Sequence, residues 1–195
     1  GPNTGGMGAF CPSAAVDDRV IQQVQAQILV PTLDALIRQH MPYRGVLYIG
    51  LMLTTAGPKV LEFNCRFGDP EAQAILLRLQ SDLLELLNAA VDGELEAADV
   101  RWDPRAALCV VMASDGYPDK YPTGLPITGL PDDTDDLVVY HAGTRQAGDQ
   151  VLTAGGRVLG VTALGATLAD ARKRAYTAVE RIHFDGAQYR TDLGA

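Results

Sequence analysis

Two β-rich runs separated by a short turn constrain the fold of this 195-residue chain most strongly. The run VLYIGLMLT, residues 46–54, is followed by TAGPK and then by VLEFNC, residues 60–65. Apolar and β-branched residues on both sides of a Gly-Pro turn predict an antiparallel hairpin. The second arm carries Glu62 and Asn64 between apolar residues, so its alternation predicts one polar face and one apolar face that packs on a core.

Glu62 and Asn64 are two residues apart, so a strand presents both side chains on the same face. Carboxylate and amide oxygens together suit a hard cation such as Mg²⁺ or Mn²⁺. The same spacing is found on the solvated face of an ordinary antiparallel hairpin. Spacing alone therefore leaves a metal site and a plain polar surface both open.

The charges that follow this strand favour an anionic ligand. Arg66 continues the alternation, and a guanidinium binds phosphate oxygens bidentately. Asp69-Pro70 is typical of a helix start with Asp69 as N-cap, and it predicts a helix from Pro70 to Val91. The N-terminus of that helix would add free N–H groups and a positive dipole end, which suit oligophosphate. Asp69 and Glu71 also fit the role of ordinary first-turn acids, and for Glu71 that interpretation is preferred.

The glycine-rich segment NTGGMG, residues 3–8, is the second candidate site. Its glycines allow a backbone nest that cradles an anion, and Asn3 and Thr4 could add polar contacts. It is not a dinucleotide fingerprint, because no strand is visible before it and no helix begins within it. A plain N-terminal loop is the alternative, and residues 1–13 as a whole are expected to form no regular element.

The rest of the chain predicts an α+β protein in two parts. Helical spacing covers residues 16–41, with Pro31 marking a kink or a second helix. The composition changes near residue 100, after which short apolar runs predict strands, and an amphipathic helix is expected over residues 168–183. We therefore expect an antiparallel sheet with helices over residues 1–99 and a small β-rich domain over residues 100–195.

Composition excludes several classes of function. The net charge of −8 and the lack of a Lys/Arg block argue against a nucleic-acid partner or a membrane surface. No apolar run is long enough to span a bilayer, and no signal peptide is expected. Three widely spaced cysteines predict reduced thiols in the core of a cytoplasmic protein, and three scattered histidines argue against a zinc enzyme or a Ser/His/Asp hydrolase.

The motifs GPNTGGMGAF and LEFNCRFGDPEAQ together resemble the phosphoribosylamine–glycine ligase family, also called glycinamide ribonucleotide synthetase, of the ATP-grasp superfamily. The resemblance continues in order through YRGVLYIGLMLT, GYPDKYPTG, YHAGT, GGRVLGVTALG, ARKRAY and YRTDLG, and so covers essentially the whole chain. The LEFNCRFGDPE block is highly specific to the family, whereas a glycine-rich loop alone would not be.

The resemblance implies an ATP-dependent carbon–nitrogen ligase of de novo purine synthesis. The family joins glycine to 5-phosphoribosylamine through an acyl phosphate, using ATP and Mg²⁺ or Mn²⁺, and releases glycinamide ribonucleotide, ADP and phosphate. The metal-binding pair of the family carries over onto Glu62 and Asn64, and its arginine onto Arg66, which would steady the transferring phosphoryl group. Asn3, Thr4, Gly5, Gly6 and Asp69 would line the substrate side.

The chain also departs from the family pattern. Many ATP-grasp enzymes place a further metal-binding acid or amide on the neighbouring strand, and residues 46–54 contain neither. The family's enzymes are about twice as long, so the chain resembles their C-terminal half and the N-terminal half would be its missing partner. By itself it is expected to be inactive. The alternatives are a non-catalytic fragment, or another ATP-grasp carboxylate–amine ligase such as a biotin carboxylase relative.

Overall fold

The computed structural model describes residues 4–195, which form two compact bodies. Residues 4–11, 69–79 and 102–195 form the first, here called the packed body, and residues 12–68 and 80–101 form the second, the hairpin body. Each body is thus assembled from separate stretches of the chain. The division into 1–99 and 100–195 stays a prediction.

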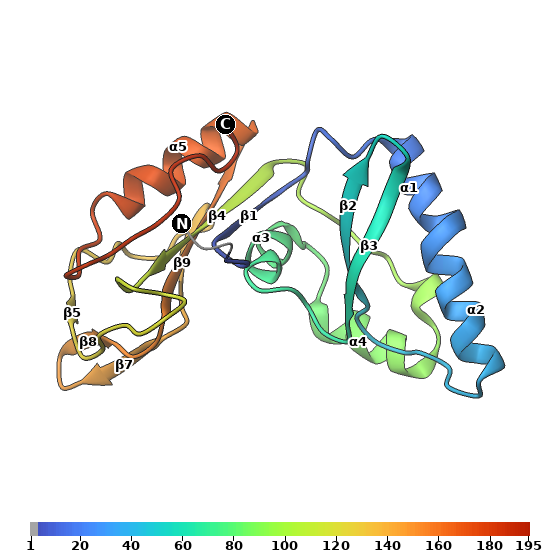
Figure 1. The fold of residues 1–195 in the computed structure, drawn as a ribbon, viewed down its shortest axis with the longest axis horizontal. Helices are drawn as coiled ribbons and strands as arrows, with labels where there is room; N and C mark the ends of the chain where they lie inside the picture. The colour runs from blue at the N-terminus through green and yellow to red at the C-terminus, as the bar shows by residue number, and fades with distance from the viewer. Residues whose placement is uncertain (1–3) are drawn as a thin grey trace. The chain divides into compact units, whose positions relative to one another are not determined.

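The packed body contains two antiparallel sheets and two helices (Figure 1). The larger sheet has the order β1-β4-β9-β6 and the smaller one the order β5-β8-β7. The strands are β1 Gly8–Cys11, β4 Ala106–Ala113, β5 Pro126–Ile127, β6 Leu137–His141, β7 Thr144–Ala147, β8 Gln150–Thr153 and β9 Arg157–Gly165. The helices are α3 Glu71–Arg78 and α5 Leu168–Val179.

Strand β4 is buried along its whole length because helices pack on both faces of its sheet. Leu108, Val110 and Met112 belong to the main core, which includes the alanines of α5. Ala107 points to the other face, where it packs with Ala74 of α3. An uninterrupted apolar run such as AALCVVMA is what a strand covered on both faces requires.

The hairpin body consists of a long helical segment, a two-stranded antiparallel sheet and a further helix (Figure 1). Its elements are α1 Asp18–Val24, a π-helical turn Gln25–Leu29, α2 Val30–Arg38, β2 Tyr48–Thr54, β3 Gly57–Asn64, α4 Leu83–Asp92 and a 3₁₀ turn Leu95–Ala97. Pro31 lies at the start of α2, directly after the π turn. Because proline cannot donate to the helical ladder, the wider turn accommodates it without ending the helix.

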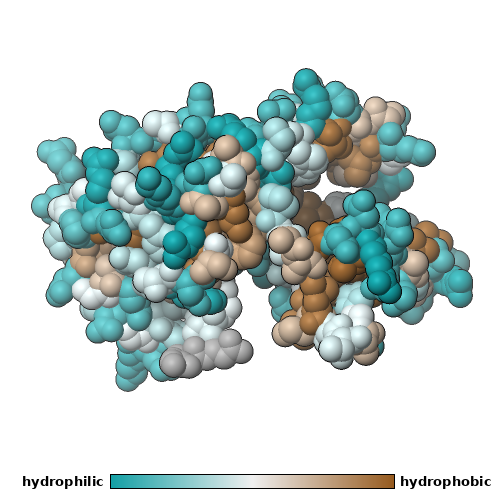
Figure 2. All heavy atoms as spheres, turned by 90° about the horizontal axis from the view of Figure 1, so that it is seen from above, coloured by the Kyte–Doolittle hydropathy of each residue, from teal (hydrophilic) through white to brown (hydrophobic). Residues whose placement is uncertain are grey.

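Large apolar side chains are exposed over much of the hairpin body, and Figure 2 shows them as brown surface. They come from the helical segment, the hairpin and α4, and include Ile21, Val30, Ile37, Met52, Leu61, Phe63, Leu84 and Val91. The apolar face expected for β3 is therefore not packed into a core, since Leu61 is 64% and Phe63 44% exposed.

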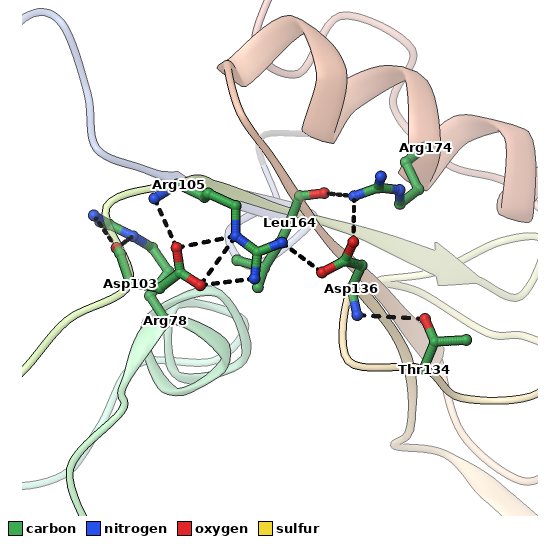
Figure 3. Close-up of polar contacts among 7 residues, drawn as sticks. All are labelled: Arg78, Asp103, Arg105, Thr134, Asp136, Leu164 and Arg174. Carbon is green, nitrogen blue, oxygen red and sulfur yellow. Dashed lines mark hydrogen bonds and ion pairs between the residues drawn. The ribbon is translucent and has the colours of Figure 1, made fainter.

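A polar network ties the loops of the packed body to its sheet and to α5 (Figure 3). Arg105 binds Asp103 at 2.7 Å and Asp136 at 2.6 Å, and Arg174 reaches Asp136 at 3.4 Å. Arg78, at the end of α3, donates to the Asp103 carbonyl at 3.0 Å. Hydrogen bonds from Arg105 hold the pKa of the buried Asp103 carboxyl below its usual value.

Two expectations about the extent of helices and strands were wrong. The predicted helix from Pro70 to Val91 is broken, because Leu79 turns to extended backbone and pairs with Trp102. A new helix, α4, starts after Asp82, whose carboxylate accepts from the backbone of Leu84 at 2.7 Å. Asp82 followed by Glu85 is a pattern typical of a helix N-terminus. It was missed because the apolar residues before and after it follow one continuous helical spacing.

The second error concerns the N-terminal segment, where Gly8–Cys11 forms strand β1 instead of loop. It pairs antiparallel with β4, with Ala9 opposite Cys109. Backbone pairing to an already buried strand outweighs the low strand propensity of a glycine-rich stretch. A Cβ at Gly8 would lie 2.2 Å from Leu193 Cδ1, so glycine also allows close packing there.

The α+β class with antiparallel sheets is confirmed, since every described strand pair is antiparallel. Among the described residues, no helix combines the length and the apolar character needed to cross a bilayer.

Candidate functional site

A bulge in the β2–β3 hairpin separates polar from apolar side chains. Gly50 pairs with Glu62 and Leu51 with Val60, so Leu61 is an extra residue in β3. Ile49 pairs with Phe63, and Ile49 and Leu51 are two residues apart on β2, so they share a face. Because directly paired residues also share a face, Val60 and Phe63 lie together on one side of the hairpin. Without the extra residue in between, positions 60 and 62 would have shared a face.

The opposite side of the hairpin carries Glu62 and Asn64, as the alternation predicted. Their partners across the ladder are Gly50 and Tyr48. A Cβ at Gly50 would lie 3.0 Å from Glu62 Cγ, so the glycine leaves room for the Glu62 side chain. Glu62 is exposed and Asn64 is half-buried, so neither residue belongs to the buried core.

Arg66 lies just beyond the end of β3, in a bend. Its guanidinium donates to Asn64 Oδ1 at 3.4 Å and to the Phe67 carbonyl at 2.8 Å. Arg66 thus joins Asn64 by a direct contact, although the strand alternation itself ends at Asn64. The three side chains Glu62, Asn64 and Arg66 form the hairpin platform.

Val60 and Phe63 face the helical segment on the other side of the sheet. They line an open groove together with Ile28, Pro31 and Leu36. The bulge therefore gives the hairpin an apolar side against the helix and a polar side that carries the platform.

The described residues contain no group of three or more His, Cys, Asp or Glu side chains that could hold a metal ion. The platform supplies two oxygen-bearing side chains, one carboxylate and one amide. Mg²⁺ is usually held by one or two carboxylates plus phosphate oxygens and water, so this donor set fits a cation bound together with a phosphate ligand.

In the packed body, the glycine-rich loop lies against two charged residues. Gly6 adopts φ +75°, a left-handed conformation that favours glycine. Arg157, at the start of β9, donates to the Gly6 carbonyl at 3.2 Å and to the Asp69 carbonyl at 2.8 Å. Gly5 has open space where a side chain would be. Thr4 and Gly5 are accessible, and Asn3 is outside the described residues.

Asp69 does not cap the following helix, so its expected N-cap role was wrong. The N-cap is Pro70, without a side-chain hydrogen bond. The Asp69 carboxylate instead accepts from Gln73 Nε2 at 3.0 Å and pairs with Arg157 Nη2 at 2.8 Å. An arginine that binds the carboxylate directly outcompetes the backbone N–H groups of the helix start.

Sequence reasoning missed Arg157, although it bonds to both Gly6 and Asp69. The one feature of the sequence that could have indicated this residue is a single charge between Gly155-Gly156 and an apolar strand, in the segment GGRVLG. A long-range contact over 151 positions has no signature in local spacing.

Comparison with known families gives two matches along this chain. The family model for the phosphoribosylglycinamide synthetase ATP-grasp (A) domain matches residues 1–72, and the model for the C domain of the same synthetase matches residues 107–195.

Individual relatives agree with these matches. A protein of Rhodopirellula baltica named phosphoribosylamine–glycine ligase is 52% identical over 99% of this chain and 45% of its own length. The crystal structure of phosphoribosylamine–glycine ligase from Thermotoga maritima superposes with a TM-score of 0.83 at 35% identity, covering 98% of this chain and 47% of that one. The biotin carboxylase domain of Hydrogenobacter thermophilus 2-oxoglutarate carboxylase reaches 0.63 at 14% identity, over 96% of this chain and 41% of that one, and shows the fold alone.

The chain thus spans about half the length of the relatives it matches. Both domain models, the sequence identity and the superposition agree with one another and confirm the resemblance seen in the sequence. The chain belongs to the phosphoribosylglycinamide synthetase family.

Proposed function

We propose that the protein containing this chain ligates glycine to 5-phosphoribosylamine. ATP would be consumed, glycyl phosphate would form as an intermediate, and glycinamide ribonucleotide, ADP and phosphate would be released in purine biosynthesis. The observation that carries the proposal is the hairpin platform, where Glu62 and Asn64 share a face and Arg66 contacts Asn64. Its support is the 52% identity to a protein named for this reaction.

Glu62 and Asn64 would hold a divalent cation, Mg²⁺ or Mn²⁺, against the phosphates of ATP. When bound, the cation neutralises phosphate charge and polarises the phosphorus–oxygen bond. No described acid on β2 adds to the pair, since the strand reads YIGLMLT. The proposal therefore needs only one cation held by this hairpin.

Arg66 would bind the phosphoryl group and the carboxylate oxygens during transfer. Within the described structure its guanidinium donates to Asn64 Oδ1 and to the Phe67 carbonyl, and a guanidinium with five N–H donors has others left for an anion. Positioning and charge neutralisation supply most of the catalysis in phosphoryl transfer. Asn3, Thr4, Gly5, Gly6 and Asp69 would form the substrate side for glycine and 5-phosphoribosylamine.

The partner for this activity would be the N-terminal half of the same enzyme, because the chain covers 45% of its relative. The chain alone is then a non-catalytic fragment, and glycine-dependent ADP formation by the purified 195-residue chain would contradict this. The three cysteines are unpaired thiols, which agrees with a cytoplasmic enzyme. Their expected place in the core was wrong for Cys65, which is exposed, whereas Cys109 is buried.

The decisive test is Glu62→Gln in the intact protein. We expect glycine-dependent ADP formation at saturating Mg²⁺ to fall at least about 100-fold, roughly 3 kcal/mol in the barrier, because the substitution removes the single negative charge that the platform offers to the cation. Asn64→Ala should show a loss of the same kind. Glu96→Gln, an exposed acid of the same body, is the matched control and should keep full activity. Near-normal turnover in Glu62→Gln would refute the assignment of the platform as a metal site.

A further inference from the structure

We infer that Arg157 is a positioning residue that sets the conformation of the glycine-rich loop on the substrate side. The inference rests on the proposed function for its catalytic consequence, and on the geometry of the packed body for the contact itself. Arg157 lies in the family motif GGRVLGVTALG but was given no role from the sequence, and its side chain contacts segments that are 88 and 151 positions away.

The guanidinium of Arg157 makes three contacts with two residues. One nitrogen, Nη1, donates to the carbonyls of Asp69 and Gly6, and the other, Nη2, pairs with the Asp69 carboxylate at 2.8 Å. A planar fork can hold two carbonyls and a carboxylate together, whereas a lysine ammonium is a single point charge. Arginine is therefore the side chain that fits this junction.

The loop is shaped to receive the guanidinium. A Cβ at Gly6 would lie 2.5 Å from Arg157 Nη1 and 2.9 Å from the Asp69 carbonyl oxygen, and φ at Gly6 is +75°. Both the close approach and the left-handed backbone therefore require glycine at this position. The guanidinium of Arg157 thus occupies the space that a side chain at position 6 would need.

Asp69 is fixed from a second side. Gln73 Nε2 donates to Asp69 Oδ1, and Gln73 Oε1 is buried without a hydrogen-bond partner in the described structure. The amide of Gln73 is thus oriented by its contact with Asp69, at the cost of one unpaired oxygen. This arrangement holds the Asp69 carboxylate toward Arg157.

The exposure of the pair argues against a role in global stability. The side chains of Arg157 and Asp69 are 27% and 50% exposed, and ion pairs of this kind contribute little to folding. The main core of the body contains neither residue. Loss of the contact should therefore loosen the loop and leave the fold intact.

The first test is hydrogen exchange on the 195-residue chain with Arg157→Lys. We expect the backbone amides of residues 5–8 to exchange at least about tenfold faster, while the thermal midpoint stays within about 2 °C. Gly6→Ala disturbs the same contact from the loop side and should give the same local pattern. Arg190→Lys is the matched control, since Arg190 pairs with Asp192 at 2.7 Å in an exposed position and should leave these amides unchanged.

The second test uses the intact protein. Arg157→Lys should raise KM for glycine or 5-phosphoribosylamine about tenfold with kcat within about threefold, because substrate positioning is lost while the platform is untouched. Unchanged exchange overturns the inference, and so does faster exchange with an unchanged KM, since the loop would then be remote from substrate. Absence of glycine-dependent ADP formation in the unmutated intact protein would refute the proposed function instead, and the exchange result would still stand.

Discussion

The packed body and the hairpin body differ in how completely they cover their apolar residues. Apart from Ile28 and Pro58, the buried apolar side chains of the described chain lie in the packed body. Most of the large exposed ones lie in the hairpin body, where they form part of the surface in Figure 2. A two-stranded hairpin is at best marginally stable by itself. The platform that carries the proposed chemistry is therefore built on the part of the chain with the weaker core.

The sharpest way to test this difference is a matched pair of leucine deletions. Leu108→Ala in the packed body should lower the free energy of unfolding by about 2–5 kcal/mol, because it leaves a cavity in a dense core. Leu61→Ala in the hairpin body should change it by less than about 0.5 kcal/mol, because that side chain is already exposed. Urea titration followed by circular dichroism measures both. Equal losses in the two variants would remove the distinction between the bodies.

Thiol reactivity compares the two bodies without any mutation. Burial raises the pKa of the Cys109 thiol to about 12, whereas Cys65 is exposed in the hairpin body. At pH 8 we expect Cys65 to be alkylated by iodoacetamide at least about 100-fold faster than Cys109, because the thiolate is the nucleophile. Peptide mass spectrometry reads out both sites. In denaturant the two rates should converge, and fast labelling of Cys109 in the native chain would show that β4 is not protected.

A third comparison uses pH. The pKa of Asp103 is lowered in the folded chain by hydrogen bonds from Arg105, so its contribution to stability is present above the unfolded value near about 3.9 and is lost as the pH falls through the lower folded value. Asp103→Asn should cost about 1.5–3 kcal/mol at pH 7. That difference should shrink below about pH 4.

The control for this prediction is Asp99→Asn in the hairpin body. Asp99 pairs with Arg101 at 3.3 Å, but both side chains are largely exposed, so the substitution should have almost no effect at any pH. The measurement is the denaturant midpoint of both variants and of the unmutated chain at pH 7, 4 and 3. A constant penalty for Asp103→Asn across that range would show that the Asp103 charge is not what stabilises the network.

Local patterns predicted the hairpin, the strand runs and the Glu62–Asn64 pair, because these depend on alternation over a few residues. They failed where distant segments decide the structure. The break after Arg78 depends on Leu79 pairing with Trp102, and strand β1 forms only because β4 is there to receive it. The same reason explains why Arg157 was missed, since its partners Gly6 and Asp69 are 151 and 88 positions away in the sequence.

The role of Asp69 illustrates this limit at a single residue. Asp-Pro is a sound N-cap pattern, and the helix does start beside it. The carboxylate is nevertheless held by Arg157 and Gln73, because a charged partner from β9 lies within reach. The Asp-Pro pattern contains no information about such a partner.

The bulge in β3 has a consequence for how the platform tolerates change. Leu61 is the extra residue, and a bulge bends its strand and increases the local twist. The direction in which Glu62 and Asn64 point is therefore determined by the number of residues in β3 and not by the side chain at position 61. Substitution of Leu61 leaves that direction alone, whereas a change of length by one residue alters it while Glu62, Asn64 and Arg66 are all still present.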